Sequence, residues 1–169
     1  MTSTALYPGS FDPITSGHVA IIERGLTMFD NIVIGVARNI SKSGLFSLDE
    51  RIEMIHQTFH DNPRVRVDTF EGLLVNYARQ TGIHIVLRGL RSMTDFEYEH
   101  QMANMNRSLY PTMETVFLLA EPSTFYVSSR LVKEVASLGG NIDPFVPNPV
   151  RARLRARFVP SATSGESIP

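Results

Sequence analysis

The sequence predicts an α/β fold, in which helices cover both faces of a parallel β-sheet. Short apolar runs alternate with amphipathic segments over most of the chain, and this alternation is typical of βαβ units with right-handed crossovers. The run over residues 32–37 is continuously apolar, as expected of a strand buried on both faces. A chain of 169 residues with no linker before about residue 159 is the size of one domain. We therefore expect a single domain over residues 1–158 and a disordered tail over residues 159–169.

Five strands are expected from runs that are continuously apolar or that alternate between apolar and polar residues. They cover residues 4–7, 32–37, 64–70, 83–87 and 116–120. Because a segment with helical periodicity follows most of them, we expect the strands to lie parallel in one sheet.

The expected helices are marked by start and stop signals. The pairs Ser47–Glu50 and Thr94–Glu97 match the capping-box pattern at a helix start. Gly82 suits the C-terminal end of a helix over residues 73–80. The remaining helices are expected to start at Gly17, after Ser128 or Ser129, and after Asn148 with Pro149 in the first helical position.

Composition excludes several classes of protein. The chain has no cysteine, so it has no disulfides, thiolate zinc sites or cysteine nucleophiles. Sixteen basic and 17 acidic residues give a net charge of −1, which provides no global attraction for nucleic acid or anionic membranes. No apolar run approaches the ~18 residues of a membrane span, and we expect a cytoplasmic protein. The arginines near the C-terminus are interpreted as a solvated helix face: Arg151, Arg153, Arg155 and Arg157.

Polar clusters follow the predicted strands, where ligands bind in parallel α/β sheets. Gly9 and Ser10 come directly after the first strand, where backbone amides can approach a phosphate. Gly17 and His18 place an imidazole in the first turn of the next helix, whose positive end favours an anion. The alternative interpretation is a plain loop with a capping or surface histidine.

Three further clusters extend the pattern. Lys42 follows the second strand, and it is one of only two lysines in the chain, the other being Lys133. The sequence Arg88-Gly89-Leu90-Arg91 leaves the fourth strand, and two guanidinium groups can bind phosphate oxygens in pairs. Ser128 and Ser129 provide hydroxyls at a helix start. The alternatives are a solvated lysine, arginines paired with Asp95, Glu97 or Glu99, and an ordinary serine cap.

These motifs carry a family resemblance. Thr15-Ser16-Gly17-His18 resembles the Thr/His-x-Gly-His hallmark of the nucleotidyltransferase superfamily. Residues 7–13, together with Arg-Gly-Leu-Arg at residues 88–91 and Phe-Glu-Tyr-Glu at residues 96–99, resemble the pantetheine-phosphate adenylyltransferases of coenzyme A biosynthesis. The resemblance covers residues 4–155. It implies a Rossmann-like doubly wound sheet and reversible adenylyl transfer from ATP to 4′-phosphopantetheine, giving dephospho-coenzyme A and pyrophosphate. It also implies Mg²⁺ bound with ATP and a homohexamer.

The resemblance also implies roles for individual residues. The catalytic residues would be His18, Lys42 and Arg91. The acceptor would be bound by Ser10, Lys42, Leu74 and Arg88. ATP would be bound by Gly9, Ser10, Phe11, His18, Gly89, Leu90, Arg91, Glu99, Thr124, Phe125, Tyr126, Val127, Ser128, Ser129 and Arg130. No residue is implied as a metal ligand. Arg130 stands where the family usually has a hydroxyl residue, and we expect it to contact ATP phosphates or an acidic neighbour.

The sequence leaves two alternatives to adenylyl transfer onto 4′-phosphopantetheine. Another small-molecule nucleotidyltransferase would use nicotinate mononucleotide or an alcohol phosphate as acceptor, which the Arg-Gly-Leu-Arg and Phe-Glu-Tyr-Glu motifs argue against. A non-catalytic nucleotide-binding sensor is the second alternative. The presence of His18, Lys42 and Arg91 together argues against a sensor.

Overall fold

Five parallel strands form one sheet in the computed structural model, which describes residues 2–38, 44–60 and 62–158. The order across the sheet is β3-β2-β1-β4-β5. The strands are β1 (Thr4–Gly9), β2 (Asn31–Ala37), β3 (Val65–Phe70), β4 (Ile85–Leu90) and β5 (Glu114–Leu119). The helices are α1 (Ser16–Gly25), α2 (Leu48–Phe59), α3 (Leu74–Thr81), α4 (Met93–Leu109), α5 (Ser129–Ser137) and α6 (Asn148–Phe158). The predicted α/β class and parallel sheet are confirmed, and both Lys42 and the tail over residues 159–169 lie outside the described residues.

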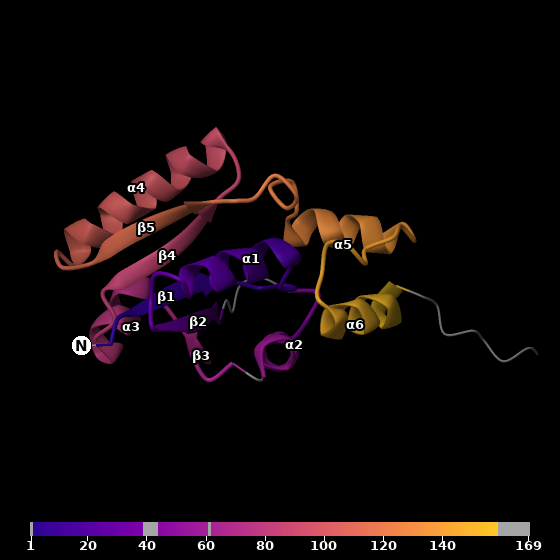
Figure 1. Ribbon diagram of the computed structural model, residues 1–169, viewed down its shortest axis with the longest axis horizontal. Helices are drawn as coiled ribbons and strands as arrows, with labels where there is room; N and C mark the ends of the chain where they lie inside the picture. The colour runs from indigo at the N-terminus through magenta and orange to yellow at the C-terminus, as the bar shows by residue number, and fades with distance from the viewer. Residues whose placement is uncertain (1, 39–43, 61, 159–169) are drawn as a thin grey trace, which may run out of the picture.

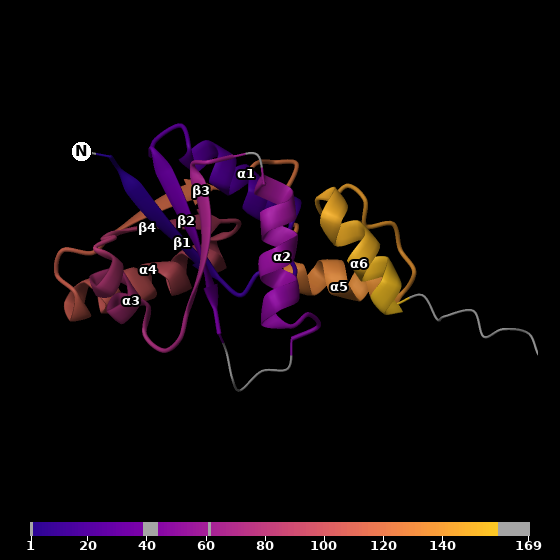
Figure 2. The ribbon, with the colours of Figure 1, turned by 90° about the horizontal axis from the view of Figure 1, so that it is seen from below.

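Helices cover both faces of the sheet (Figures 1 and 2). Ala5 and Tyr7 of β1 belong to the large core that packs under α1, α2, α5 and α6. Leu6, between them, belongs to a smaller core with Tyr77 of α3. Successive side chains of a strand point to opposite faces, so a strand buried on both faces is apolar throughout, as the sequence is.

The order of the strands fixes where a ligand can bind. The chain runs outward from β1 through β2 to β3, and β4 then returns to pair with β1 on its other side. Helices that follow β1 and β4 therefore leave toward opposite faces, which opens a crevice beyond the carboxyl ends of these two strands. Gly9 ends β1 and Leu90 ends β4, so the predicted phosphate motifs meet at this crevice.

Several of the predicted helix signals are confirmed. Ser47 accepts a hydrogen bond from the Glu50 amide at 3.2 Å, and the Glu50 side chain accepts one from the Ser47 amide at 2.8 Å. Gly82 caps α3 in the left-handed conformation, with φ of 68°. Ser128 is the N-cap of α5, since its hydroxyl accepts from the Leu131 amide at 3.1 Å.

Two predictions around β4 are wrong. Ser92, not Thr94, caps α4, because its hydroxyl accepts from the Asp95 amide at 3.2 Å. The strand starts at Ile85 and continues to Leu90, so Arg88 lies inside it rather than beyond it. A charged residue is tolerated there because Glu99 and the Pro8 carbonyl accept its hydrogen bonds.

The arginines of α6 do more than face solvent. Arg153 pairs with Glu53 at 2.7 Å and Arg157 with Glu50 at 2.6 Å, so two of them join α6 to α2. Arg155 pairs with Asp143 at 2.7 Å in the loop before α6. The prediction of a merely solvated face is corrected accordingly. None of the helices over the described ranges is long and apolar enough to cross a membrane.

The capping correction leads to a direct test. Replacing Ser92 by alanine removes the side chain that satisfies the Asp95 amide, and we expect a loss of about 1 kcal/mol in the free energy of unfolding. Thr94→Ala is the matched control and should change stability by less than about 0.5 kcal/mol. Urea titration followed by circular dichroism measures both. If Thr94→Ala lost as much free energy of unfolding as Ser92→Ala or more, the capping box predicted from the sequence would be supported instead.

Candidate active site

The loop between β1 and α1 is built on a small aromatic cluster. Phe11 is 2% exposed, and its ring contacts those of Tyr7 and His18 edge-on, with centroids 5.6 and 5.2 Å away. The backbone at Phe11 has a φ of 47°, a region that favours glycine, so the packing of its ring holds a strained conformation. A Cβ at Gly9 would lie 2.9 Å from this ring. Gly9 is therefore required so that Phe11 can fold back beneath the loop.

His18 is held in one orientation by a reciprocal capping interaction with Thr15. The Thr15 hydroxyl accepts from the His18 amide at 3.4 Å, and His18 Nδ1 accepts from the Thr15 amide at 3.0 Å. In this capping box the imidazole occupies the place usually taken by a glutamate. Since Nδ1 accepts, we assign the proton of the neutral ring to Nε2, which leaves an N–H donor for a ligand.

The environment of His18 keeps its imidazole neutral. Burial, together with the smaller effect of the positive charges of Arg91 and Arg88, lowers the pKa of His18 from 6.5 to about 4. At neutral pH the ring is therefore a hydrogen-bond donor without a charge. Burial also raises the pKa of Tyr7, so this neighbouring side chain stays a phenol.

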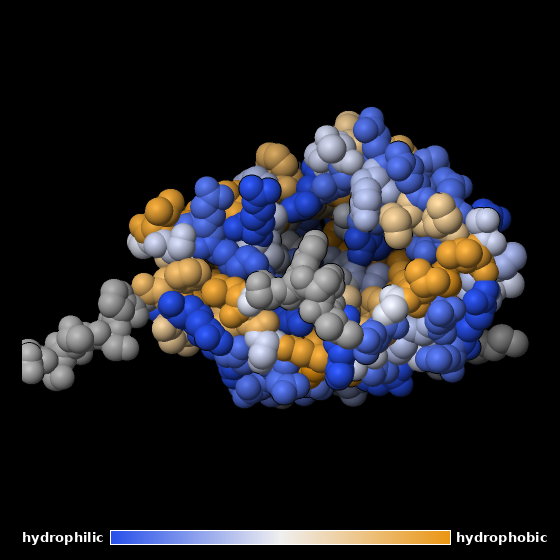
Figure 3. All heavy atoms as spheres, turned by 180° about the vertical axis from the view of Figure 1, so that it is seen from behind, coloured by the Kyte–Doolittle hydropathy of each residue, from blue (hydrophilic) through white to orange (hydrophobic). Residues whose placement is uncertain are grey.

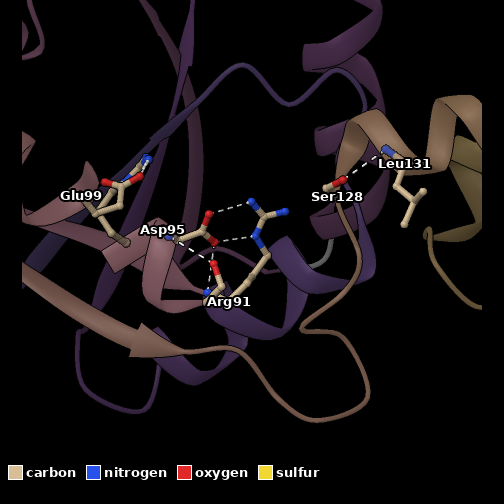
Figure 4. Close-up of polar contacts among 7 residues, drawn as sticks. Arg91, Asp95, Glu99, Ser128 and Leu131 are labelled. Atoms are coloured by element: carbon tan, nitrogen blue, oxygen red, sulfur yellow. Dashed lines mark hydrogen bonds and ion pairs between the residues drawn. The ribbon is translucent and has the colours of Figure 1, made fainter. Parts of the chain in front are cut away.

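Two arginines from β4 and its following loop are held by carboxylates of α4. Arg88 Nε donates to Glu99 at 2.7 Å, a second Arg88 nitrogen also donates to Glu99, and its third donates to the Pro8 carbonyl at 2.6 Å. Arg91 Nε donates to Asp95 at 2.9 Å, as Figure 4 shows. Asp95 and Glu99 lie one turn apart on α4, so one helix face orients both guanidinium groups.

These groups surround a cavity of about 310 Å³ beyond the carboxyl ends of β1 and β4. Figure 3 shows one face of the molecule hollowed near its centre, with hydrophilic side chains along part of the rim and hydrophobic side chains on one side of it. Most of the residues predicted to bind ATP line this polar cavity: Gly9, Ser10, Phe11, His18, Gly89, Arg91, Glu99, Thr124, Val127, Ser128 and Ser129.

A second cavity of about 220 Å³ lies beside the first and is mainly apolar. Its lining includes the predicted acceptor residue Leu74, with Phe70, Val86 and Met102. Met102 of α4 therefore faces this cavity. Both cavities share the same boundary residues: Pro8, Gly9, Ser10, Arg88 and Glu99.

Some predicted residues lie elsewhere. Leu90 lines a shallow apolar hollow with Met93 and Leu119, and Phe125 and Tyr126 are exposed beside the polar cavity rather than lining it. Arg130 is exposed and does not line the cavity either. These assignments, which the family resemblance implies, remain predictions. Glu99 lines both cavities, but its carboxylate is already bound to Arg88.

The structure adds residues that the motif analysis did not single out for the site. Asp12 is 8% exposed and accepts hydrogen bonds from the amides of Leu45 and Phe46. Arg51 of α2 donates to the Ser10 carbonyl at 2.7 Å and so attaches α2 to the loop between β1 and α1. Neither has a recognisable spacing in the sequence, because both act across more than thirty residues of chain.

Within the described ranges, no group of three or more His, Asp or Glu residues is placed so that it could hold a metal ion. One side-chain oxygen there is buried without a partner, the hydroxyl of Thr124, which lines the polar cavity. A buried hydroxyl without a hydrogen bond is costly, so a ligand that fills this cavity would gain from pairing with it.

Comparison with known proteins agrees with this geometry. Residues 6–135 match the model of the cytidylyltransferase-like family. The chain is 53% identical over 154 residues to a protein of Syntrophotalea carbinolica named phosphopantetheine adenylyltransferase, an alignment that covers 91% of this chain and 93% of the relative. Proteins of the same name from an Anaeromyxobacter species and from Geobacter metallireducens are 52% and 53% identical. These alignments cover 94% and 91% of this chain, and 96% and 94% of the relatives.

The low pKa of His18 predicts a pH dependence of stability. Below pH 6.5 the unfolded chain protonates this imidazole while the folded protein excludes the proton until about pH 4, so His18 lowers stability as the pH falls through this window. From pH 7 to pH 5 the loss from His18 should be about 1–2 kcal/mol.

His18→Gln isolates this contribution, because glutamine can keep the capping box but does not titrate. Urea titrations at pH 7 and pH 5 should show a smaller pH dependence for the variant than for the parent protein. The same pH dependence in both proteins would contradict a neutral, buried His18.

Proposed function

We infer the activity from one premise: the chain belongs to the cytidylyltransferase-like family and, within it, to the phosphopantetheine adenylyltransferases. It is a nucleotidyltransferase of coenzyme A biosynthesis. Its reaction is the reversible transfer of the adenylyl group of ATP to 4′-phosphopantetheine, which gives dephospho-coenzyme A and pyrophosphate.

The junction of the two cavities is the observation that carries this proposal. The polar cavity suits a nucleoside triphosphate, and the apolar cavity beside it suits the pantetheine arm of the acceptor. Ser10 and Arg88 lie on the shared boundary, where the acceptor phosphate would face the α-phosphate of ATP. We assign the acceptor phosphate to this boundary for that reason.

The chemistry requires alignment more than proton transfer. The second pKa of a phosphate monoester is about 6, so the acceptor is already a dianion at neutral pH and needs no general base. One of its oxygens forms a bond to the α-phosphorus, and the bond from that phosphorus to the bridging oxygen of the β-phosphate breaks. Pyrophosphate leaves with the electron pair. The protein must hold two like-charged phosphates in line and stabilise the charge that develops between them.

The proposed catalytic residues fit this requirement. Neutral His18 donates Nε2–H to an α-phosphoryl oxygen in the transition state, and Arg91 adds a positive charge. We assign the same electrostatic role to Lys42 by its family resemblance. The donor on Nε2 makes His18 a poor nucleophile, so we propose direct transfer without an adenylylated enzyme. Mg²⁺ is proposed to enter as part of the substrate MgATP.

A pyrophosphate-release assay tests the proposal. With ATP and 4′-phosphopantetheine the protein should release pyrophosphate and form a product with the mass of dephospho-coenzyme A, whereas nicotinate mononucleotide or glycerol phosphate should give no turnover. His18→Ala should fold normally, bind ATP nearly as well, and lose about 10²–10³ in kcat. Release of pyrophosphate with another acceptor alone would reject the assignment, and labelled ATP that leaves a stable adenylyl group on His18 would reject direct transfer.

We also propose that the chain works in the cytoplasm and forms a homo-oligomer. Apolar side chains are exposed on α4 and on the edge strand β5, namely Met93, Phe96, Met105, Leu109 and Leu119. An uncovered edge strand with apolar side chains favours association with another chain.

Light scattering during size-exclusion chromatography measures the oligomer. A hexamer, as the resemblance implies, would have six times the 18.9 kDa of one chain. Leu119, 70% exposed at the end of β5, is the residue to change. Leu119→Glu should shift the protein to a smaller species, while a monomeric parent protein would overturn the proposal.

A further inference from the structure

Asp12 joins three segments that are far apart in the sequence. Its carboxylate accepts from the Leu45 amide at 3.0 Å, from the Phe46 amide at 2.9 Å, and from Lys133 Nζ at 2.7 Å. The Asp12 side chain is only 11% exposed and that of Lys133 31%. Burial alone would raise the pKa of Asp12, but the hydrogen bonds from Lys133 and the two amides outweigh it and hold the pKa below its usual range. The carboxylate is therefore a charged anchor.

Lys133 belongs to α5, the helix whose start carries Ser128 and Ser129. A second bond attaches this helix to the same loop, because the Ser129 hydroxyl donates to the Pro13 carbonyl at 2.7 Å. Thus α5 contacts the loop after β1 at two consecutive residues, Asp12 and Pro13. The two serines line the polar cavity, as do Gly9 at the end of β1, Ser10 in the loop and His18 in the first turn of α1, but Lys133 and Asp12 do not line it.

The choice of lysine is also explained by this contact. A Cβ on Gly44 would lie 3.1 Å from Asp12 Oδ2, so the space around this oxygen is narrow. Oδ2 already accepts the Leu45 amide, and a compact ammonium group can add a single hydrogen bond beside it. A planar guanidinium group would instead compete with the two amides for the carboxylate. In a chain whose sixteen basic residues include only two lysines, this position needs one of them.

We propose that Lys133 and Asp12 are a positioning pair for adenylyl transfer. The pair fixes the serine hydroxyls at the start of α5 relative to the phosphate loop between β1 and α1, and neither residue contacts a substrate. This inference rests on the proposed function for its kinetic effects. Its structural effect, anchoring of the Leu45 and Phe46 amides through Asp12, is independent of that function.

A double-mutant cycle tests the pairing. Lys133→Met keeps the length of the side chain without its charge, and we expect kcat/KM for ATP to fall about 10- to 100-fold, mainly through kcat. Asp12→Asn should have an effect of at least that size, and the double variant should be no worse than Asp12→Asn alone. Lys133→Arg, which keeps the charge, should recover part of the loss. The matched control is Arg155→Met, which removes the exposed Arg155–Asp143 ion pair and should leave the kinetics unchanged.

Three results would overturn the pairing. Wild-type kinetics for Lys133→Met would show that Lys133 has no role in the reaction. If the fold-changes in kcat/KM of the two single variants multiplied in the double variant, the two residues would act independently. A raised KM for ATP in Lys133→Met, with Asp12→Asn unchanged, would make Lys133 a direct phosphate ligand.

Amide hydrogen exchange without ligand gives a second measurement that does not need an active enzyme or a folded Asp12→Asn variant. In Lys133→Met the amides of Leu45 and Phe46 should exchange at least tenfold faster than in the parent protein, because the carboxylate that they bind loses its ammonium partner. Unchanged exchange at both amides would overturn the proposal. If the parent protein failed to release pyrophosphate, the proposed function would fall, while the exchange data would still decide whether the pair anchors this segment.

Discussion

Parallel pairing of β1 with both β2 and β4 is the constraint on which the rest of this structure depends. It places the carboxyl end of β1 beside that of β4, with helices leaving toward opposite faces. The loop that follows β1 is about seventy residues from Arg88 of β4 and from Arg91 just beyond it, yet all of them line one cavity because their strands are neighbours. The apolar runs of the strands thereby determine where the polar motifs meet.

The charges at this crevice are balanced before any substrate arrives. Arg88 and Arg91 are each bound to a carboxylate of α4, and His18 is neutral. Positive charge is thus available without strong repulsion between these groups, and each guanidinium group is held in a fixed direction. Preorganised donors of this kind stabilise a transition state more than flexible ones, because they do not have to reorient during the reaction. Asp95 and Glu99 lower the net positive charge of the site, but they hold the two guanidinium groups in fixed orientations.

The sequence predicted those features that depend on local patterns. Alternation of strands and helices, the Ser47–Glu50 capping box and the Gly82 helix end are all read from neighbouring residues, and the structure confirms them. The motifs for the polar cavity were also found, since they lie at or just beyond the carboxyl ends of β1 and β4. The extension of β4 to Leu90 was missed because Arg88 looks like the end of a buried strand until its partner on α4 is known.

Long-range contacts account for the remaining differences. Ser92 and Thr94 both stand ahead of an acidic residue, and only the actual start of α4 decides between them. The sequence alone indicates a solvated face for the arginines of α6, because their partners Glu53 and Glu50 lie on the distant helix α2. Asp12 stands within a recognised motif, but its two amide partners and Lys133 come from distant segments, so no spacing in the sequence indicates their contact.

Two features of the polar cavity are explained by a ligand better than by the fold. A Cβ on Gly17 would make only ordinary contacts, the nearest being 3.6 Å from the Thr124 carbonyl, and alanine is a better helix former than glycine. Stability alone therefore does not require glycine at this helical position. Gly17 lines the cavity, as does Thr124, whose hydroxyl is the buried side-chain oxygen left without a partner in the described part of the chain. The missing side chain leaves room, and the unpaired hydroxyl offers a hydrogen bond, at the same end of the cavity. Both are costs to stability that a ligand filling this cavity would offset.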